Sequence, residues 1–262
     1  MRPFIKLSSS KNPVVQVVRR AIAKGRPTET GLIVAEGPHL FAEALGGKWQ
    51  IEQVLTTAAG LERHAALLNH GSAEILEVSS RVFASMADTE TTQEILFLLR
   101  PREWSWHHLL HSSALVVVLD GIQDPGNAGT IVRSAEAFGG SGIVFLKGCV
   151  RVANGKFLRG TAGSIFRMPY LEDVSPAAFM PEIRSARLTL YALVPAADES
   201  VSTANFRGGC ALVVGSEGAG VSDELLAEAR TVSIPTREVE SLNAAVACSI
   251  ALFTAQQQRG RP

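Results

Sequence analysis

The stretch that decides the fold is "ALVVVLDGIQDPGNAGTIVRSAEAFGG", residues 114–140. The apolar run at 114–119 predicts a buried strand, and the apolar residues at 127–138 recur at helical spacing. The turn between them holds Asp, Pro, Gly and Asn, which are residues that end strands and begin helices. In α/β proteins, turns of this kind between a buried strand and a helix are where ligands bind. We therefore expect an α/β fold with a ligand site at this turn.

The rest of the second half repeats this alternation. Further strands are predicted at 142–146, 188–193, 210–215 and 231–235, and further helices at 222–229 and about 241–258, with a basic helical segment at about 154–166. Strands that are apolar throughout and alternate with helices indicate a parallel sheet buried on both faces.

The first half is a smaller unit of the same kind. "NPVVQVVRRAIAKGR" opens with Asn12-Pro13, which is a helix-start signal, and strands alternate with helices from there to about residue 100. Pro101 and a cluster of aromatic and polar residues then break the pattern, which indicates a linker. The expected parts are a small α/β/α domain at 1–103, a linker at 104–112 and a second domain at 113–262.

Composition excludes several classes of protein. No apolar stretch of the 262 residues approaches the length that spans a bilayer, and the N-terminus lacks the apolar core of a secretory signal. Cys149, Cys210 and Cys248 are far apart and odd in number, so reduced core thiols are expected rather than disulfides or a metal site. His107 and His111 are four residues apart without a Cys or carboxylate partner, which favours packing over metal binding. We expect no metal and a cytoplasmic location.

The charges balance in number, with 25 basic and 25 acidic residues, but not in distribution. The first 28 residues hold several Lys and Arg residues and no acid, and a second acid-free span runs from Ala137 to Leu171. Two basic stretches in a neutral protein indicate an anionic partner such as nucleic acid. Solvated faces balanced by acids elsewhere explain the same pattern equally well.

Two more strand ends resemble the first one in composition. "LVVGSEGAGVSDELL" (212–226) runs from a strand into Gly, Ser and Glu, and "SIPTREVESLNAAVACSIALF" (233–253) runs from a strand through Pro235 into a helix. Each of them alone is explained by a tight turn or a helix cap. Together they indicate a pocket, because the carboxyl ends of parallel strands meet at one edge of a sheet. They match neither a Walker A loop, nor GxGxxG, nor the GxSxG of a serine hydrolase, so the ligand stays open.

The three turns together resemble the motifs of the SpoU (TrmH) branch of the SPOUT methyltransferases. "NAGTIVRSAEAFG", "VVGSEGAGVS" and "IPTREVESLNAAVACSIALF" match its three motifs in order, and "GKFLRGTAGSIFRMPY" resembles the stretch between the first two. "KNPVVQVVRRAIAKGR" and "GLIVAEGPHLFAEAL" are similar to the appended substrate-binding domain, which has an L30e-like fold. The resemblance covers nearly the whole chain.

This resemblance implies methyl transfer from S-adenosylmethionine to a ribose 2′-hydroxyl of structured RNA. Large-subunit ribosomal RNA is the favoured substrate, and transfer RNA is the alternative. The resemblance also implies a parallel-sheet domain with a C-terminal trefoil knot, and a homodimer. A non-catalytic RNA-binding ribosome-assembly factor on the same fold is a further alternative. The chain lacks the motifs of a hydrolase and of a nucleotide-binding enzyme, which argues against both.

The resemblance also assigns residues to roles. The catalytic candidates are Asn127, Arg133, Glu217, Ser241 and Asn243. The cofactor-binding candidates are Leu193, Gly215, Glu217, Gly218, Ile234, Pro235, Leu242 and Asn243. The basic residues expected to contact RNA are Lys11, Arg19, Arg20, Lys24, Arg26 and Arg159.

Several of these assignments have competing interpretations. The family assigns the matching arginine to activation of the ribose hydroxyl, but a guanidinium holds its proton strongly, so Arg133 is either a base or a binder of phosphate and hydroxyl. Ser241 and Asn243 either orient substrate or cap the last helix. The chain departs from the family at "TREV" (236–239), which is shorter and has no glycine, so the backbone path around the cofactor is expected to differ there.

Overall fold

The computed structural model describes residues 4–70, 72–89 and 91–260. Its contacts divide the chain into two compact units. Unit 1 comprises Met1–Glu103 and Arg151–Arg167, and unit 2 comprises Trp104–Val150 and Met168–Pro262. The segment 151–167 was expected in the second domain, but its contacts group it with unit 1.

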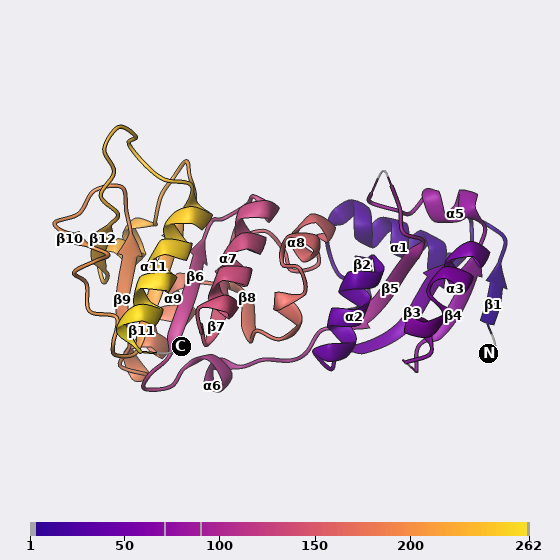
Figure 1. Ribbon diagram of the computed structural model, residues 1–262, viewed down its shortest axis with the longest axis horizontal. Helices are drawn as coiled ribbons and strands as arrows, with labels where there is room; N and C mark the ends of the chain where they lie inside the picture. Colours follow the sequence, from indigo (N-terminus) through magenta and orange to yellow (C-terminus); the bar gives the residue numbers. More distant parts are fainter. Residues whose placement is uncertain (1–3, 71, 90, 261–262) are drawn as a thin grey trace. The chain divides into compact units, whose positions relative to one another are not determined.

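Unit 2 is built on a seven-stranded sheet in the order β10-β12-β9-β11-β6-β7-β8 (Figure 1). Its strands are β6 (Leu115–Asp120), β7 (Gly142–Leu146), β8 (Tyr170–Val174), β9 (Thr189–Leu193), β10 (Glu199–Ser200), β11 (Cys210–Gly215) and β12 (Arg230–Ser233). All pairings between these strands are parallel, as the apolar sequences of β6, β7, β9 and β11 predict. From β6 the chain goes to β7 on one side and later returns to β11 on the other. The strand order therefore reverses at β6, which is the point where open α/β sheets bind ligands.

Helices cover both faces of this sheet. Helices α7 (Pro125–Ala137) and α11 (Ala244–Gln258) lie side by side over one face in Figure 1, where they pack against each other. The other face packs against α6 (Trp106–Leu109), α9 (Pro176–Ser185) and α10 (Asp223–Leu226), whose buried apolar residues join those of the strands in one core. The central strands β6, β7, β9 and β11 are thus buried on both sides, and the sheet edge at their carboxyl ends stays open for a site.

Arg259 anchors the C-terminal end of the last helix by hydrogen bonds. Its guanidinium donates hydrogen bonds to the carbonyl oxygens of Phe206 (2.7 Å), Ser113 (2.8 Å) and Gly208 (2.5 Å). These carbonyls belong to the segments that lead into β6 and β11. Because several charge-assisted hydrogen bonds hold one end of α11, the helix has a fixed position relative to the two central strands.

Unit 1 has a five-stranded mixed sheet in the order β1-β4-β3-β5-β2. The strands are β1 (Phe4–Leu7), β2 (Ile33–Glu36), β3 (Gln50–Thr56), β4 (Glu74–Val78) and β5 (Ile95–Arg100). Strand β5 runs antiparallel to β2 and β3, and the remaining pairings are parallel. The helices are α1 (Pro13–Lys24), α2 (Pro38–Gly46), α3 (Ala58–Arg63), α4 (Ala65–Leu68), α5 (Ser80–Ala84) and, from the later segment, α8 (Gly155–Gly160) and the 3₁₀ helix η1 (Ser164–Phe166). Helix α1 begins as expected, because the Asn12 side chain accepts a hydrogen bond from the Val14 N–H (2.9 Å).

The segment 151–167 is part of the packing of unit 1. The indole N–H of Trp49 donates to the carbonyl of Phe166 (3.0 Å), and the two rings meet edge to face at 5.1 Å. Arg167 forms an ion pair with Glu43. At Gly47, a Cβ atom would lie 2.5 Å from the carbonyl oxygen of Phe166, so a residue without a side chain is needed for this approach.

The expected elements differ from the observed ones at several places. Strands β1, β8 and β10 and helices α6 and α9 were not expected. The final helix was expected from about residue 241 and begins at Ala244, because Asn243 is its N-cap. Strand β1 has only four residues and is recognisable from its parallel pairing with β4 rather than from its own pattern.

The cysteines are free thiols, as expected, and two of them are buried. Burial raises the pKa of the Cys248 thiol to about 12 and that of Cys149 to about 11, so both stay protonated near neutral pH. Within the described part of the chain, no helix is long and apolar enough to cross a membrane.

Candidate active site

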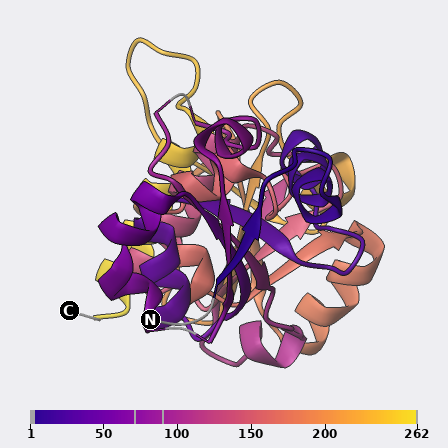
Figure 2. The same ribbon diagram turned by 90° about the vertical axis from the view of Figure 1, so that its right-hand side faces the viewer.

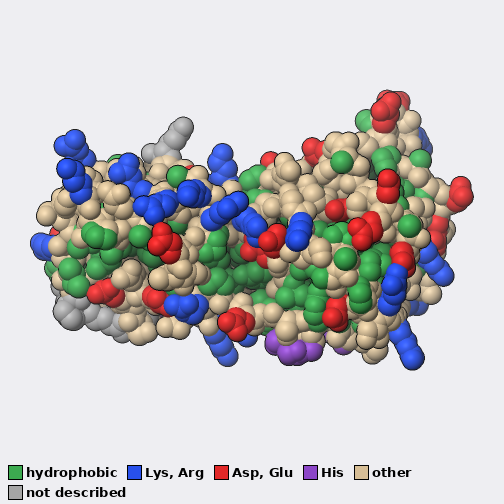
Figure 3. Space-filling model, turned by 180° about the vertical axis from the view of Figure 1, so that it is seen from behind, with side chains coloured by type: hydrophobic (Ala, Val, Ile, Leu, Met, Phe, Trp, Pro, Cys, Tyr) green, Lys and Arg blue, Asp and Glu red, His purple; other side chains and the backbone are tan. Residues whose placement is uncertain are grey.

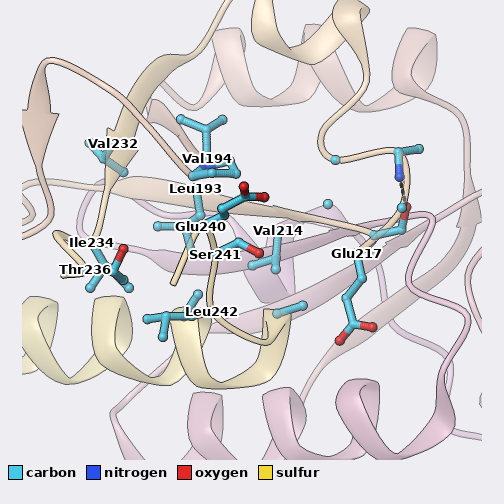
Figure 4. A pocket seen from close by; sticks show the side chains of 18 residues that line it. Leu193, Val194, Val214, Glu217, Val232, Ile234, Thr236, Glu240, Ser241 and Leu242 are labelled. Carbon is cyan, nitrogen blue, oxygen red and sulfur yellow. Dashed lines mark hydrogen bonds between the residues drawn. The ribbon is translucent and has the colours of Figure 1, made fainter. Parts of the chain in front are cut away.

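A cavity of about 300 Å³ opens at the carboxyl ends of β9, β11 and β12 (Figure 4). Its wall is largely apolar and includes Leu193, Val214, Val232, Ile234 and Leu242. Polar contacts are available from the backbone of the turn after β11. An apolar slot with main-chain hydrogen-bonding groups is the usual form of a small-molecule site.

The turn after β11 is folded back tightly over the end of its own strand. The Gly220 N–H donates to the carbonyl of Ser216 (2.8 Å), and the Ala219 N–H donates to the Ser216 hydroxyl (3.2 Å). A Cβ atom on Gly215 would lie 2.0 Å from the carbonyl carbon of Gly220. Gly220 itself has φ +70°, in the left-handed region that favours glycine. The glycines therefore allow the backbone, rather than side chains, to form this wall of the cavity.

The loop between β12 and α11, residues 234–243, forms the opposite wall and stands away from the sheet in Figures 1 and 2. Here the chain departs from the family pattern at 236–239. The Thr236 hydroxyl donates to the carbonyl of Val239 (2.7 Å), which closes this loop without a glycine. Thr236, Glu240, Ser241 and Leu242 line the cavity, so the departure does not remove the loop from the site.

A second cavity of about 320 Å³ adjoins the first at the end of β6. It is lined by residues 121–124 and Asn127 from the turn before α7, and by Ser216, Glu217 and Gly218. These last three residues line the first cavity as well. The turn after β11 is therefore a shared wall between two adjacent spaces.

A hydrogen-bond network joins all three motifs at this wall. The Asn127 amide donates to Glu217 (3.0 Å), and the Asn243 amide donates both to Glu217 (2.8 Å) and to the Asn127 side-chain oxygen (2.9 Å). The Asn243 oxygen also accepts from the Ala245 N–H (3.0 Å) as the N-cap of α11. Because the oxygen is used in the cap, the amide nitrogen of Asn243 faces Glu217. Asn243 is therefore the N-cap of α11 and a member of this network, and its role toward the substrate stays a prediction.

The cofactor-binding candidates gather at the first cavity. The candidates that line it are Leu193, Gly215, Glu217, Gly218, Ile234 and Leu242. Pro235 and Asn243 do not line it, although Asn243 contacts Glu217. Their roles in binding remain predictions.

The catalytic candidates do not all lie at the same place. Ser241 lines the first cavity, and Asn127, Glu217 and Asn243 form the network. Arg133 is exposed on α7, lines neither cavity, and has no ion-pair partner among the residues that the structure describes. Within one chain, Arg133 is therefore separate from the site to which it was assigned.

The basic residues expected to bind RNA all belong to unit 1. Those of the N-terminal stretch are exposed: Lys11, Arg19, Arg20, Lys24 and Arg26. Arg20 forms an exposed ion pair with Glu29 (3.2 Å). Arg159 is paired with Asp88 (2.8 Å) and is only partly exposed, so its guanidinium is already engaged.

Two acidic residues of unit 2 were not predicted. Asp120, at the end of β6, accepts a hydrogen bond from the Ser222 N–H (2.7 Å) and so anchors the far end of the turn after β11. Glu240 lines the first cavity. It stands directly before Ser241, a catalytic candidate, and this position is the signal in the sequence that could have found it.

The histidines of α6 are exposed and lie close together. His107 and His108 stack with ring centroids 3.9 Å apart, and each has a ring nitrogen within hydrogen-bonding distance of the Ser105 hydroxyl (2.7 and 2.9 Å). Figure 3 shows histidine side chains gathered at one place on the surface. The described residues contain no group of three or more His, Cys, Asp or Glu side chains that is suited to a metal ion.

These features define a class of protein. Two adjacent cavities at the carboxyl ends of a parallel sheet, the second of them at the switch point and with a polar network at their shared wall, suit an α/β enzyme that holds two ligands side by side for group transfer. Residues 114–253 match the SpoU rRNA Methylase family, and residues 12–96 match the MRM3-like substrate binding domain. The first match covers more than half of the chain, so the chain belongs to the SpoU rRNA methylase family.

Individual relatives agree with this assignment over nearly the full length. An uncharacterized tRNA/rRNA methyltransferase of Synechocystis sp. is 32% identical over 97% of this chain and 94% of its own. The 23S rRNA (guanosine(2553)-2′-O)-methyltransferase RlmP of Bacillus subtilis is 30% identical over 94% of this chain and 97% of its own. The AdoMet-bound structure of an rRNA methyltransferase from Sinorhizobium meliloti matches with a TM-score of 0.84 at 29% identity, covering 96% of this chain and 97% of that one.

The chain is therefore an RNA methyltransferase whose methyl donor is S-adenosylmethionine. The first cavity fits this cofactor. Its apolar walls suit an adenine ring, and the turn 215–220 presents backbone groups at close range because a Cβ at Gly215 would have no space.

Proposed function

We propose that this methyltransferase acts on a ribose 2′-hydroxyl of large-subunit ribosomal RNA. The observation that carries the proposal is the network of Asn127, Glu217 and Asn243 at the wall shared by the cofactor cavity and the second cavity. Support for the substrate comes from the names of two relatives. They are the 23S rRNA (guanosine(2553)-2′-O)-methyltransferase RlmP of Bacillus subtilis and the 23S rRNA (guanosine-2′-O-)-methyltransferase RlmB of Xanthomonas campestris.

The residues of this chain divide the work of the reaction. S-adenosylmethionine supplies a methyl group on a sulfonium, which is already activated, so the protein mainly has to place the two reactants. The first cavity holds the donor, and the second accepts the nucleoside that presents the hydroxyl. Asn127 and Asn243 fix Glu217 between them, so that the shared wall keeps its shape during transfer. Arg133 binds the neighbouring phosphate and polarises the hydroxyl.

Mapping of 2′-O-methyl groups in total RNA, with and without the gene, tests this function. We expect one methyl group to disappear from large-subunit ribosomal RNA when the gene is deleted. Loss of a methyl group from transfer RNA instead would contradict the proposed substrate but not the chemistry. If no methyl group is lost, and calorimetry detects no binding of S-adenosylmethionine, the non-catalytic alternative replaces the proposal.

We infer that two copies of the chain form a homodimer through α11. Three apolar side chains of this helix are exposed at helical spacing: Val246 (48% exposed), Ile250 (38%) and Phe253 (48%). Helix α7, which carries Arg133, packs beside α11. A partner that covers this stripe would lie next to Arg133, which supports a site completed by both chains. The trefoil knot implied by the resemblance is part of this proposal, and the turn after β11 and the loop 234–243, which would form it, line the same cavity.

The dimer is expected to separate when Ile250 is replaced by Glu, because the carboxylate would be buried without a partner at the interface. Light scattering should then report a monomer, and methyl transfer should fall to background. The control Ala177→Glu adds the same charge at an exposed position of α9, on the other face of the sheet, and should leave the dimer intact. A monomeric wild-type protein that methylates RNA at full rate would contradict the dimer.

Mixed subunits test whether the site is shared. Arg133→Ala and Asn243→Ala chains are each expected to be inactive alone. In a mixed dimer, one of the two sites has intact residues from both chains, so activity should return. Failure to recover activity, with mixed dimers shown to form, would place Arg133 in the site of its own chain.

We further infer that unit 1 contacts RNA through α1. Arg19, Arg20 and Lys24 are exposed on this helix, while Val15, Val18 and Ala21 are buried. The turn after α1 approaches the later segment, since a Cβ on Gly25 would lie 3.2 Å from the Asn154 amide nitrogen. Figure 3 shows Lys and Arg side chains gathered over this part of the unit. This arrangement supports a phosphate-binding face.

Replacing Arg19, Arg20 and Lys24 together by Ala should weaken RNA binding, most strongly at low salt. Each lost phosphate contact makes the negative slope of log K against log salt shallower by roughly 0.7 to 0.9, so three lost contacts should change it by about 2 to 3. RNA binding at several salt concentrations measures it. Arg63, Arg81 and Arg100 are exposed on other elements of unit 1, and their triple Ala variant is the control. An unchanged slope in the α1 variant would mean that unit 1 recognises RNA through another face.

A further inference from the structure

We propose that Glu240 gives the cofactor cavity a preference for the cationic methyl donor over the neutral product that remains after transfer. The inference rests on the proposed function, because it concerns exchange of the spent cofactor between reaction cycles. It assigns a role in ligand discrimination to a side chain that takes no part in the hydrogen-bond network.

The wall of the cavity has one sign of charge. Among the described residues that form it, two are carboxylates, Glu217 and Glu240, and none is Lys, Arg or His. Negative charge beside a cavity attracts a cationic ligand, and because both carboxylates are exposed, water and salt screen this attraction in part.

The two carboxylates differ in their surroundings. Glu217 accepts hydrogen bonds from Asn127 and Asn243, so part of its charge is already compensated. Glu240 has no ion-pair partner in the part of the chain that the structure describes. Figure 4 shows Glu240 beside Ser241 and near Leu193 and Val194, whereas Glu217 lies to one side of the cavity. Glu240 is thus the free negative charge at the cofactor cavity.

The reaction changes the charge of the ligand. The donor has a sulfonium, an ammonium and a carboxylate, and its net charge is +1. In the transfer, the bond between the methyl carbon and sulfur breaks, the sulfur keeps the electron pair, and a bond forms between the methyl carbon and the ribose oxygen, whose proton goes to solvent. S-adenosylhomocysteine, which remains, has a neutral thioether and no net charge. A carboxylate at the cavity attracts the donor more than this product, and so favours the exchange of one for the other.

Calorimetry on the full-length Glu240→Gln variant tests the proposal without measuring activity. We expect the Kd of S-adenosylmethionine to rise about threefold to fivefold, which is the effect of one exposed ion pair, while that of S-adenosylhomocysteine stays unchanged. Sinefungin, which has an amine near the sulfur position, should follow the donor because the two have equal charge. The difference should shrink at high salt. Glu238→Gln is the matched control, since Glu238 is exposed in the same loop but does not line the cavity.

Two results would overturn the proposal. An equal loss of affinity for donor and product, with methylthioadenosine unaffected, would mean that Glu240 pairs with the ammonium that both ligands share. No change for either ligand would mean that its charge is irrelevant to the cavity. Failure of the proposed function gives a different result, because then the wild-type protein methylates no ribosomal RNA whatever the affinities of the variant are.

Discussion

Replacing Arg133 by Ala is expected to slow methyl transfer by at least about a hundredfold, which is the usual cost of removing one donor that stabilises a transition state. The Kd of S-adenosylmethionine should change by less than about threefold, because a residue that does not contact the cofactor cavity has little effect on the free energy of binding there. The physical reason is the position of the side chain, which is exposed on α7 and lines neither cavity. Single-turnover methylation and calorimetry measure the two quantities.

Two further variants sharpen this test. Arg133→Lys keeps the charge but loses the planar fork that binds phosphate through two hydrogen bonds, so an intermediate rate is expected. Arg207→Ala removes an exposed arginine elsewhere in unit 2 and should leave the rate unchanged. Near-normal turnover of Arg133→Ala would contradict the assigned role.

The second large effect is expected from Gly215→Ala. The new methyl group would lie 2.0 to 2.2 Å from backbone atoms of Gly220 and Val221, so the turn after β11 must move. Overpacking of this kind costs about 1–3 kcal/mol of stability. The displaced turn is also a wall of both cavities, and we expect the affinity for S-adenosylmethionine to fall at least about tenfold, equivalent to roughly 1.4 kcal/mol.

Thermal unfolding and calorimetry together separate these two consequences. Gly208→Ala is the control, because a Cβ there meets no atom within 4 Å and the backbone is not in the left-handed region. It should match the wild type in both measurements. If Gly215→Ala binds the cofactor normally, the turn 216–220 does not depend on the close approach at Gly215.

Much of unit 2 is predictable from local sequence. The strands at 142–146 and 210–215 are found at the expected residues, because a fully buried parallel strand is apolar throughout and ends at a turn signal. The three turns could be located as well, because each follows such a strand and is rich in Gly, Pro and polar residues. Their ligand could not, since the hydrogen bonds that join Asn127, Glu217 and Asn243 connect residues far apart in the chain and have no periodicity. Only the resemblance to a family related these residues to one another.

What the sequence did not predict depends on tertiary contacts. Strand β1 is four residues long and alternates too briefly to be distinguished from a loop without its partner β4. The position of Arg133 outside the cavities could not be predicted. The spacing between Asn127 and Arg133 gives their relative directions around α7, but it does not show which direction faces the cavities. Glu240 was not predicted, because the loop holds two exposed acids, Glu238 and Glu240, and a place next to Ser241 does not show that a side chain lines a cavity.

The packing of residues 151–167 with unit 1 sets an order of events during protein synthesis. When residue 103 has left the ribosome, the surface around Trp49 and Gly47 still lacks Phe166, which is made 63 residues later. Chains elongate at about 5–20 residues per second, so this surface stays uncovered for several seconds. During that time β6, α7 and β7 emerge as well. The first half of the gene product thus completes its fold only after the second half has begun, and the nascent chain has an interval in which chaperones can bind it.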